Sequence, residues 1–380
     1  MIEKFHNTQP VPEKGIEEHS KEKDPTNLVY EKPVFIRENA PEYVESIKGD
    51  FNDFYASLGY DEHQPVLVSS GIDPTVRFIG SHISVLKPYL IEETIPTPGY
   101  FINQECVRTQ NISNLFNDEH VSRWGSSFVS LGAISPATRL NEVCHEVAQF
   151  LEDTQGIKKD NIRIRISSQD EDLMPACVQY FLPENIEVDT QQPQYYRHKI
   201  GVDGVWGRNF NIALRNPSGE GFSDVGNIIL IENAEKKLGV EVALGASTIL
   251  KQLYNLDHVN DCYPITGLPS MDPKISRKLE DAIIVSTILE REGLEPSATG
   301  NRERILRTYV RSLSYFRSRA NLTLDELSKV IYDFETRQFK ESETNVSEKI
   351  VGYVKRYEEE LLEGNPKTPE DKIIKEALSK

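Results

Sequence analysis

Two kinds of hydrophobic spacing divide the chain into segments. In residues 41–58 and 140–151, apolar side chains recur three and four positions apart, which predicts helices that each bury one face. Ser135 and Pro136 precede the second of these and predict an N-cap followed by proline at the first helical position. Other apolar runs are short, and in several of them apolar and polar residues alternate, as in half-buried strands. Strands are predicted in this way at residues 65–69, 100–107, 126–131, 162–166, 210–214, 228–231 and 240–244.

Beyond residue 256 the spacing becomes helical throughout. We predict helices at residues 278–292, 296–311, 323–339 and 345–363. Strands grouped before helices, with few crossover helices between them, indicate an α+β fold rather than a Rossmann fold. We expect an antiparallel sheet flanked by helices and followed by an all-helical domain. The expected boundaries are 1–40 for a polar, extended or poorly ordered arm, 41–255 for the sheet domain and 256–380 for the helical domain.

The composition narrows the classes of function. The 380 residues carry a net charge of −17 at pH 7, which argues against nonspecific coating of nucleic acid, so we expect no DNA partner. A local basic face can still bind RNA. No apolar run reaches membrane-spanning length and the N-terminus lacks a signal-peptide core, so we expect a cytoplasmic protein with no membrane partner. The four cysteines form no C-x-x-C pair, which predicts neither a disulfide framework nor a metal site.

Candidate chemistry is concentrated where two predicted strands are joined by a polar loop. Arg108 lies where the first strand ends. A guanidinium in such a place can hold a phosphate or a carboxylate through two parallel hydrogen bonds, which lysine cannot do. The run Q-E-C-V-R that ends at Arg108 resembles motif 2 of the class II aminoacyl-tRNA synthetases, most closely the form found in alanyl-tRNA synthetases.

Further blocks extend this resemblance, in the order of that family, over residues 45–360. They are D-P-T from Asp73, K-P-Y from Lys87, the strands within 204–214 and 224–231, and residues 240–249 at the position of motif 3. The resemblance implies a class II synthetase-like catalytic core followed by a helical tRNA-binding domain. Nothing in the sequence corresponds to the family's editing domain, so we expect a divergent relative that activates its substrate without proofreading.

The resemblance also implies roles for single residues. Arg108 and Gly245 would belong to an ATP site, with Arg108 as the catalytic residue, and Glu241 would hold the ammonium group of an amino acid. Asn227 matches an asparagine of the family's amino-acid site. From its residue type, Trp206 is a candidate wall of a small pocket. ATP and Mg²⁺ are the implied cofactors, and a small, alanine-like amino acid is the implied substrate.

Several positions depart from the family pattern. Thr248 stands where motif 3 has an arginine that contacts ATP, and Asn111 and Ser113 stand where motif 2 has carboxylates. Activation needs a cation to neutralise the charge that develops on pyrophosphate. Arg123 and Arg208 are candidate substitutes for the missing arginine, and a structural or surface role is the alternative for both.

A basic stripe marks the predicted helix at 296–311. Arg304, Arg307 and Arg311 follow one another at three and four positions, so they share one helical face. The segment resembles the tRNA-acceptor helix of alanyl-tRNA synthetases, which implies contact with RNA phosphates. On periodicity alone, a solvated helix face is the alternative.

Three functions stay open at this point. The chain activates a small amino acid with ATP and transfers it to tRNA or another aminoacyl acceptor; it is a noncatalytic relative that binds tRNA; or it is a structural partner that dimerises with a synthetase. A homodimer or a heterodimer is compatible with the sequence. ATP binding would separate the first function from the others, and tRNA binding would separate the second from the third.

Overall fold

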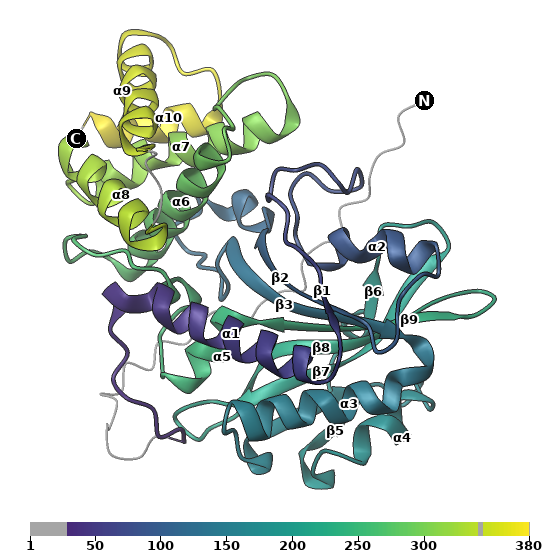
Figure 1. Cartoon of the computed structure of the whole chain (residues 1–380). Coiled ribbons are helices and arrows are strands. Elements are labelled where there is room, and N and C mark those ends of the chain that lie inside the picture. Colours follow the sequence, from purple (N-terminus) through teal and green to yellow (C-terminus); the bar gives the residue numbers. More distant parts are fainter. Residues whose placement is uncertain (1–28, 341–344, 380) are drawn as a thin grey trace.

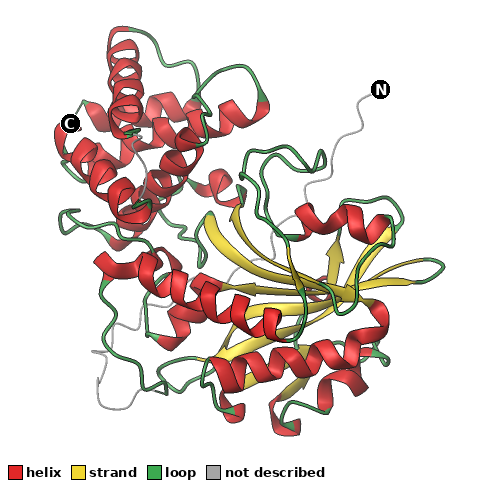
Figure 2. Cartoon of the chain, viewed as in Figure 1, coloured by secondary structure: helices red, strands yellow, loops and turns green. Residues whose placement is uncertain are grey.

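A single mixed sheet forms the centre of the molecule. The computed structural model describes residues 29–340 and 345–379. Within them, a nine-stranded sheet has the strand order β1-β2-β3-β9-β8-β7-β4-β5, with β6 paired to β7. Figure 1 shows helices α6–α10 gathered at one end of this sheet, and Figure 2 shows the strands as one curved layer with helices on both sides. The expected α+β class, with a helical part after the sheet, is confirmed.

The strands are antiparallel in every pairing except β1 with β2 and β4 with β5, which are parallel. Their bounds are β1 Asp61–Glu62, β2 Tyr100–Val107, β3 Ser127–Pro136, β4 Ile162–Ile166, β5 Ile186–Val188, β6 Arg197–Lys199, β7 Val205–Arg215, β8 Phe222–Asn233 and β9 Lys237–Gly245. The bounds of the helices are α1 Ala40–Ser57, α2 Ile83–Ile91, α3 Leu140–Gln149, α4 Leu173–Val178, α5 Ala246–Leu253, α6 Pro273–Arg291, α7 Asn301–Arg319, α8 Leu324–Gln338, α9 Ser347–Glu363 and α10 Pro369–Leu378.

Alternation along the strands gives the sheet two different faces. On β9, Val240, Val242 and Leu244 belong to a hydrophobic core that includes side chains of α1, α3 and α5. Glu241 and Gly245 point to the opposite face. Helix α2 packs over part of that second face, and the remainder carries a cavity.

Helix α1 shows why the predicted amphipathic segment folds as it does. Ile47, Phe51 and Tyr55 recur at helical spacing and are buried against the sheet. The ring of Phe51 meets that of Phe150 edge to face, with centroids 5.4 Å apart. Burying one such side chain stabilises the fold by about 1.5–3 kcal/mol.

A second hydrophobic core joins the sheet domain to helices α6–α10, which we call the helical region. Most of its side chains come from α6, α7, α8 and α9, but Val68, Phe78, Val107 and Leu115 belong to it as well. Helix α8 begins at a capping box formed by Thr323 and Glu326, which satisfies amide groups that the first turn leaves unpaired. The two parts of the chain therefore share one core across the expected boundary at residue 256.

Two local predictions are wrong. Residues 65–69 form no strand, because Glu292 accepts the amide hydrogens of Val68 and Ser69 that a neighbouring strand would otherwise take. Ser135 is not an N-cap. It continues β3 opposite Val240 of β9, and helix α3 begins only at Leu140, after a short 3₁₀ turn.

The expected arm is only partly described, since residues 1–28 lie outside the described residues. Residues 29–39 are anchored on both parts of the chain. The hydroxyl of Tyr30 donates to the Arg215 carbonyl oxygen at 2.9 Å, and Arg37 pairs with Glu280 of α6 at 2.8 Å. All four cysteines are buried with free thiols. Among the described helices, none has both the length and the apolar character needed to cross a membrane.

Candidate functional site

A cavity of about 430 Å³ opens on the second face of the sheet. Its walls come from the end of β2, from β3, β6, β8 and β9, and from the start of α5. Four of the residues singled out in the sequence line it together: Arg108, Asn227, Glu241 and Gly245. Arg108 and Glu241 are far apart in the sequence and meet here because β3 pairs with both β2 and β9.

Glu241 lies at the base of the cavity. Its side chain is 2% exposed, and burial raises the pKa of its carboxyl group to about 8, although Arg108 and Lys87 act in the opposite direction. Nε2 of His82 lies 3.2 Å from Oε1 of Glu241, at an angle that does not satisfy a hydrogen bond. A cation that enters the cavity would stabilise the ionised form of Glu241, which burial otherwise disfavours.

His82 is buried behind the cavity wall, next to Glu241. Burial lowers the pKa of His82 to about 3, with a smaller contribution from Arg108, so the ring is neutral near pH 7. Its Nδ1 lies 2.8 Å from the hydroxyl oxygen of Ser130. The ring is packed on Gly132, where a Cβ would come within 2.2 Å of it. Only glycine at position 132 leaves room for the imidazole beneath Glu241.

Arg108 is held by backbone groups on two sides. Its amide N–H donates to the Ser126 carbonyl oxygen at 2.7 Å, and its Nε donates to the Gly80 carbonyl oxygen at 2.7 Å. The guanidinium carbon lies 4.7 Å from the centre of the Phe128 ring. Among the described residues, none accepts a hydrogen bond from its two Nη groups, and the side chain is exposed in the cavity. Both Nη groups are thus available to an anionic ligand.

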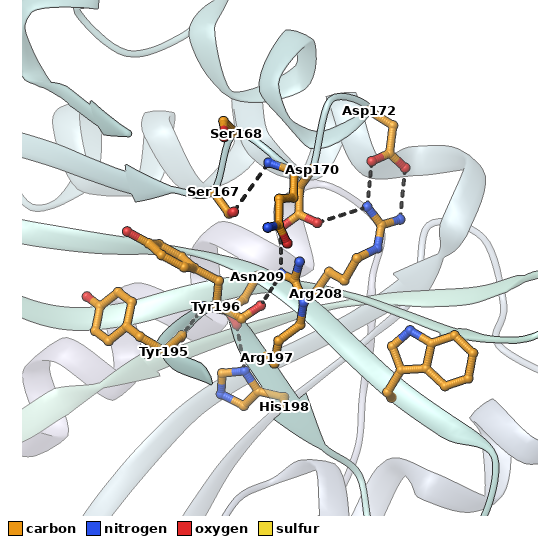
Figure 3. Close-up of polar contacts among 12 residues, drawn as sticks. Ser167, Ser168, Asp170, Asp172, Tyr195, Tyr196, Arg197, His198, Arg208 and Asn209 are labelled. Atoms are coloured by element: carbon orange, nitrogen blue, oxygen red, sulfur yellow. Dashed lines mark hydrogen bonds and ion pairs between the residues drawn. The ribbon is translucent and has the colours of Figure 1, made fainter. Parts of the chain in front are cut away.

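Asparagines form the polar part of the cavity floor. Asn209 donates to the Oδ1 of Asn211 at 2.6 Å, and Asn227 donates to the same oxygen at 3.3 Å. Nδ1 of His198 lies 2.8 Å from Oδ1 of Asn209, a contact drawn in Figure 3. These hydrogen-bonded side chains link β6, β7 and β8, and they orient Asn227 at the cavity surface.

Thr248 lines the cavity, but its hydroxyl hydrogen is directed to the backbone. Its hydroxyl donates to the carbonyl oxygens of Gly245, at 2.7 Å, and Val225, at 3.2 Å. A Cβ at position 245 would come within 2.6 Å of the Thr248 hydroxyl oxygen, so glycine permits this close turn into α5. The turn closes one wall of the cavity without adding a positive charge.

Trp206 and Arg208 lie outside the cavity lining. Both alternate along β7 with the residues that face it, so they point to the other side of the sheet. Trp206 is 39% exposed, and its indole N–H donates to Glu232 at 3.0 Å. Arg208 pairs with Glu232 at 2.6 Å and with Asp172 at 2.6 Å. The alternation within residues 204–214 was the sequence signal that could have excluded both from the pocket.

Figure 3 shows that Arg208 belongs to a separate ionic cluster. Asp170, which is 1% exposed, pairs with Arg197 at 2.7 Å and with Arg208 at 3.4 Å. The hydrogen bonds that Arg208 donates to Asp172 and Glu232 raise the pKa of its guanidinium above the ordinary value. These ion pairs tie the loop before α4 to β6 and β7, which indicates a structural role for Arg208.

The remaining predicted cation, Arg123, lies on the exposed surface of the loop beside Trp124 and is not part of the lining. The structure instead brings a cation to the cavity that the sequence reasoning missed. Lys199 ends β6 and lines the cavity with an exposed side chain. A three-residue strand of charged and polar residues (R-H-K) carries no hydrophobic pattern, which is why it was not recognised.

The cavity suits an anionic ligand better than a metal ion held by the protein alone. Arg108 and Lys199 can meet phosphates. Its two carboxylates are Glu241, which burial keeps protonated near pH 7, and Asp224, which is paired with Arg165. Among the described residues, no three metal-ligating side chains converge. The residues present therefore do not fit a Mg²⁺ site made by the protein alone.

The three arginines of α7 lie in different surroundings. Arg304 is exposed, and its Nε donates to the Gly300 carbonyl oxygen at 3.0 Å. Arg307 is partly buried, and burial, with the nearby Arg311, lowers the pKa of its guanidinium. Arg311 pairs with Asp371 of α10 and lies over the Tyr357 ring, 4.5 Å from its centre. Arg304 and Arg307 are thus freer to meet a ligand than Arg311.

Comparison with protein-family models and with curated proteins gives no match. Solved structures that resemble the chain include apo histidyl-tRNA synthetase of S. aureus, with a TM-score of 0.38 and 11% identity over 74% of this chain and 87% of the other. The RNA binding domain of threonyl-tRNA synthetase from Cryptosporidium parvum gives 0.38 and 12%, over 73% and 81%. The pyrrolysyl tRNA synthetase PylSc of Desulfitobacterium hafniense gives 0.34 and 10%, over 56% and 70%.

Proposed function

We propose that the chain activates a small, alanine-like amino acid with ATP in this cavity and transfers the aminoacyl group to tRNA or another acceptor. The observation that supports the proposal most directly is the meeting of Arg108 and Glu241 in one cavity. One is a guanidinium with both Nη groups available, and the other is a buried carboxyl group that a cation would ionise. An amino acid and a nucleotide need such a pair of opposite charges.

In this proposal the ammonium group of the amino acid meets Glu241, and Asn227 receives a polar group of the substrate from the cavity floor. An oxygen of the amino-acid carboxylate attacks the α-phosphorus of ATP, the bond to the bridging oxygen breaks, and pyrophosphate leaves. Arg108 holds the carboxylate and the α-phosphate in line and stabilises the charge that develops on the phosphoryl oxygens. Gly245, which lines the cavity at the turn into α5, would lie beside the nucleotide.

Lys199 is the proposed replacement for the arginine that Thr248 displaces. Its ammonium group is a point charge on a flexible chain, whereas a guanidinium presents its donors in a rigid plane. Lys199 therefore suits the neutralisation of the leaving pyrophosphate better than the in-line positioning of the reacting groups. Mg²⁺ would enter with the nucleotide, and no step is assigned to it. We expect the product to be an aminoacyl-adenylate, with tRNA as the acceptor reached from the side of α7.

Amino-acid-dependent exchange of pyrophosphate into ATP tests the proposal. We expect exchange with alanine or another small amino acid, and none when the amino acid is left out. Lys199→Ala should lower the exchange rate, while Lys236→Ala, a change of the same kind at an exposed lysine outside the cavity lining, should not. Absence of exchange with every amino acid, with and without tRNA, would contradict an activating function.

A noncatalytic RNA-binding function is the second candidate, and one observation favours it. The hydroxyl of Thr248 is satisfied by two backbone carbonyl oxygens, so motif 3 offers ATP no charge. In that case Arg304 and Arg307 would still bind tRNA, with Arg311 holding their helix in place. Binding of tRNA without any exchange activity would support this candidate, and a synthetase subunit would then be the partner to search for in a homo- or heterodimer.

A further inference from the structure

The helical region contacts both backbone segments that hold Arg108. The first segment is the loop from Arg108 to Ser126, which joins β2 to β3. The second is the loop from residue 66 to residue 80, whose last carbonyl oxygen accepts the Nε hydrogen of Arg108. Both loops lie on the sheet domain, yet many of the polar contacts that fix them come from α6 and α7.

Asp281 of α6 fixes the end of the first loop. It is 6% exposed, and it accepts the amide hydrogen of Ser126 at 2.7 Å and the hydroxyl hydrogen at 2.5 Å. Tyr309 of α7 donates to the same hydroxyl oxygen at 2.9 Å. The carbonyl oxygen of Ser126 then accepts the amide hydrogen of Arg108 at 2.7 Å. One buried carboxylate is thus two hydrogen bonds away from the backbone of Arg108.

The middle of the same loop is held along α6 and α7. Lys278 donates to the carbonyl oxygens of Asn114, at 2.9 Å, and Asn117. Arg319 pairs with Asp118 at 2.7 Å. These contacts leave the loop attached to the helical region over most of its length.

Glu292, which directly follows α6, fixes the second loop. Its two carboxylate oxygens accept the amide hydrogens of Val68 and Ser69, each at 2.7 Å. The carbonyl oxygen of Val68 accepts the amide hydrogen of Ile79 at 2.9 Å, and that of Ile79 accepts the amide hydrogen of Val107 at 2.8 Å. Gly80 is the residue after Ile79 in this segment, and its carbonyl oxygen orients the Arg108 guanidinium.

We infer that Asp281 and Glu292 are positioning residues for Arg108, so that the helical region is a working part of the cavity rather than an appended module. The inference rests on the proposed function for its kinetic test. Asp281 in the middle of α6 and Glu292 just after its last residue brace the two backbone segments between which the guanidinium lies. A displacement of about 1 Å in such a group can cost about 100-fold in rate.

Hydrogen-bonding capacity predicts opposite results for two conservative changes. Glu292→Gln keeps one acceptor oxygen and places an NH₂ group against an amide N–H, so one of two bonds is lost. Asp281→Asn can still accept from the Ser126 amide and donate to its hydroxyl oxygen, if the Ser126 hydroxyl donates to the Tyr309 oxygen in exchange, so both contacts to position 281 survive. Asp281→Leu removes both. Glu290→Gln is the control, since Glu290 lies near the end of α6 and is buried, but its charge interacts with Lys349 of α9.

The first measurement is alanine-dependent pyrophosphate exchange in the full chain. Glu292→Gln and Asp281→Leu should lower kcat about tenfold or more with the alanine KM changed less than about twofold, because Arg108 acts on the reacting groups. Asp281→Asn and Glu290→Gln should stay within about twofold of the wild type. In an Arg108→Lys background, Glu292→Gln should have little further effect, because the guanidinium that it positions is already gone.

The second measurement does not need activity. Trp206→Phe leaves Trp124, in the first loop, as the single tryptophan, and iodide quenching then reports how firmly that loop is held. Asp281→Leu should raise the quenching constant, and Asp281→Asn should not. Equal quenching in all variants, or equal exchange in Glu292→Gln and Glu290→Gln, would overturn the inference. No exchange in the wild type with a clear quenching difference would instead contradict the proposed function alone.

Discussion

At the scale of single residues, the burial of Glu241 in the cavity lowers the stability of the folded chain near pH 7. Glu241 is buried with no hydrogen-bond donor aligned on it from His82, and its pKa is about 8. A carboxyl group with an ordinary pKa near 4.5 must therefore bind a proton to fold near pH 7. Such a group is retained where a ligand uses it, because functional sites commonly hold strained or desolvated groups.

Glu241→Gln should raise the melting temperature, and by more at pH 8 than at pH 5. The pKa of Glu241 is higher in the folded protein than in the unfolded chain, so its stabilising contribution is complete below about 4.5 and is lost as the pH rises towards about 8. Glutamine does not ionise, and the effects of Arg108, Lys87 and His82 are common to both proteins. Thermal melts at the two pH values measure the difference. An equal gain at both would contradict the raised pKa.

Arg108→Ala should lower the exchange rate about 100-fold or more, since one lost contact to a developing charge costs about 3 kcal/mol. Arg77→Ala is the control, because Arg77 is an exposed arginine outside the cavity lining. Initial rates at saturating ATP and alanine provide the comparison. Wild-type activity in Arg108→Ala would remove this residue from the mechanism.

At the scale of elements, the sequence was most informative where pattern and burial agree. Strand β2 begins and ends where alternation predicted, at Tyr100 and Val107, and α1 is displaced by a single residue from its predicted bounds. Prediction failed where long-range partners decide the local structure. Nothing near Val68 in the sequence reveals that Glu292 takes its amide hydrogen, and nothing near Ser135 reveals its pairing with β9.

For the candidate site too, residues in local motifs were predicted, and residues placed by long-range contacts were missed. Arg108, Asn227, Glu241 and Gly245 were found through local motifs and do lie together. Trp206 was assigned from its residue type without regard to the side of β7 on which it lies. Lys199, His82 and Asp281 were missed because each owes its place to tertiary contacts, with only a charged or polar side chain visible locally.

On helix α7, Arg311 should contribute to the stability of the fold, whereas Arg304 should not. Arg311→Ala should lower the melting temperature, because it leaves Asp371, which is 3% exposed, without its ion pair. Arg304→Ala should not, because its guanidinium is exposed. Thermal melts of both variants test this. Equal melting temperatures for Arg311→Ala and the wild type would mean that the ion pair contributes nothing.

If α7 binds RNA, the double change Arg304→Glu and Arg307→Glu should weaken tRNA binding and reduce the slope of log affinity against log salt by roughly 2. On a chain with net charge −17, phosphate contacts need such a local basic stripe. Fluorescence anisotropy with labelled tRNA at several salt concentrations would give the slope. An unchanged slope would leave these arginines as a solvated surface.

At the scale of the whole molecule, the shared core predicts a single unfolding transition. Val68, Phe78, Val107 and Leu115 pack with side chains of α6–α9, so neither part can unfold without exposing apolar surface of the other. Calorimetry should give equal calorimetric and van't Hoff enthalpies. A fragment that ends at residue 255 should be insoluble or unfolded. Two resolved transitions, or a well-folded fragment, would show that the parts are independent.

The attachment of the loop at Arg108–Ser126 to α6 and α7 has a consequence for synthesis of the chain on the ribosome. The loop emerges first, and the residues that hold it, up to Arg319, follow roughly 200 residues later, which takes about 10–40 s at bacterial rates of elongation. During that interval the sheet can begin to form while the loop and its apolar side chains stay uncovered. A newly made chain should thus acquire its cavity only after α7 has emerged, and chaperones that shield exposed apolar segments would act on it in the meantime.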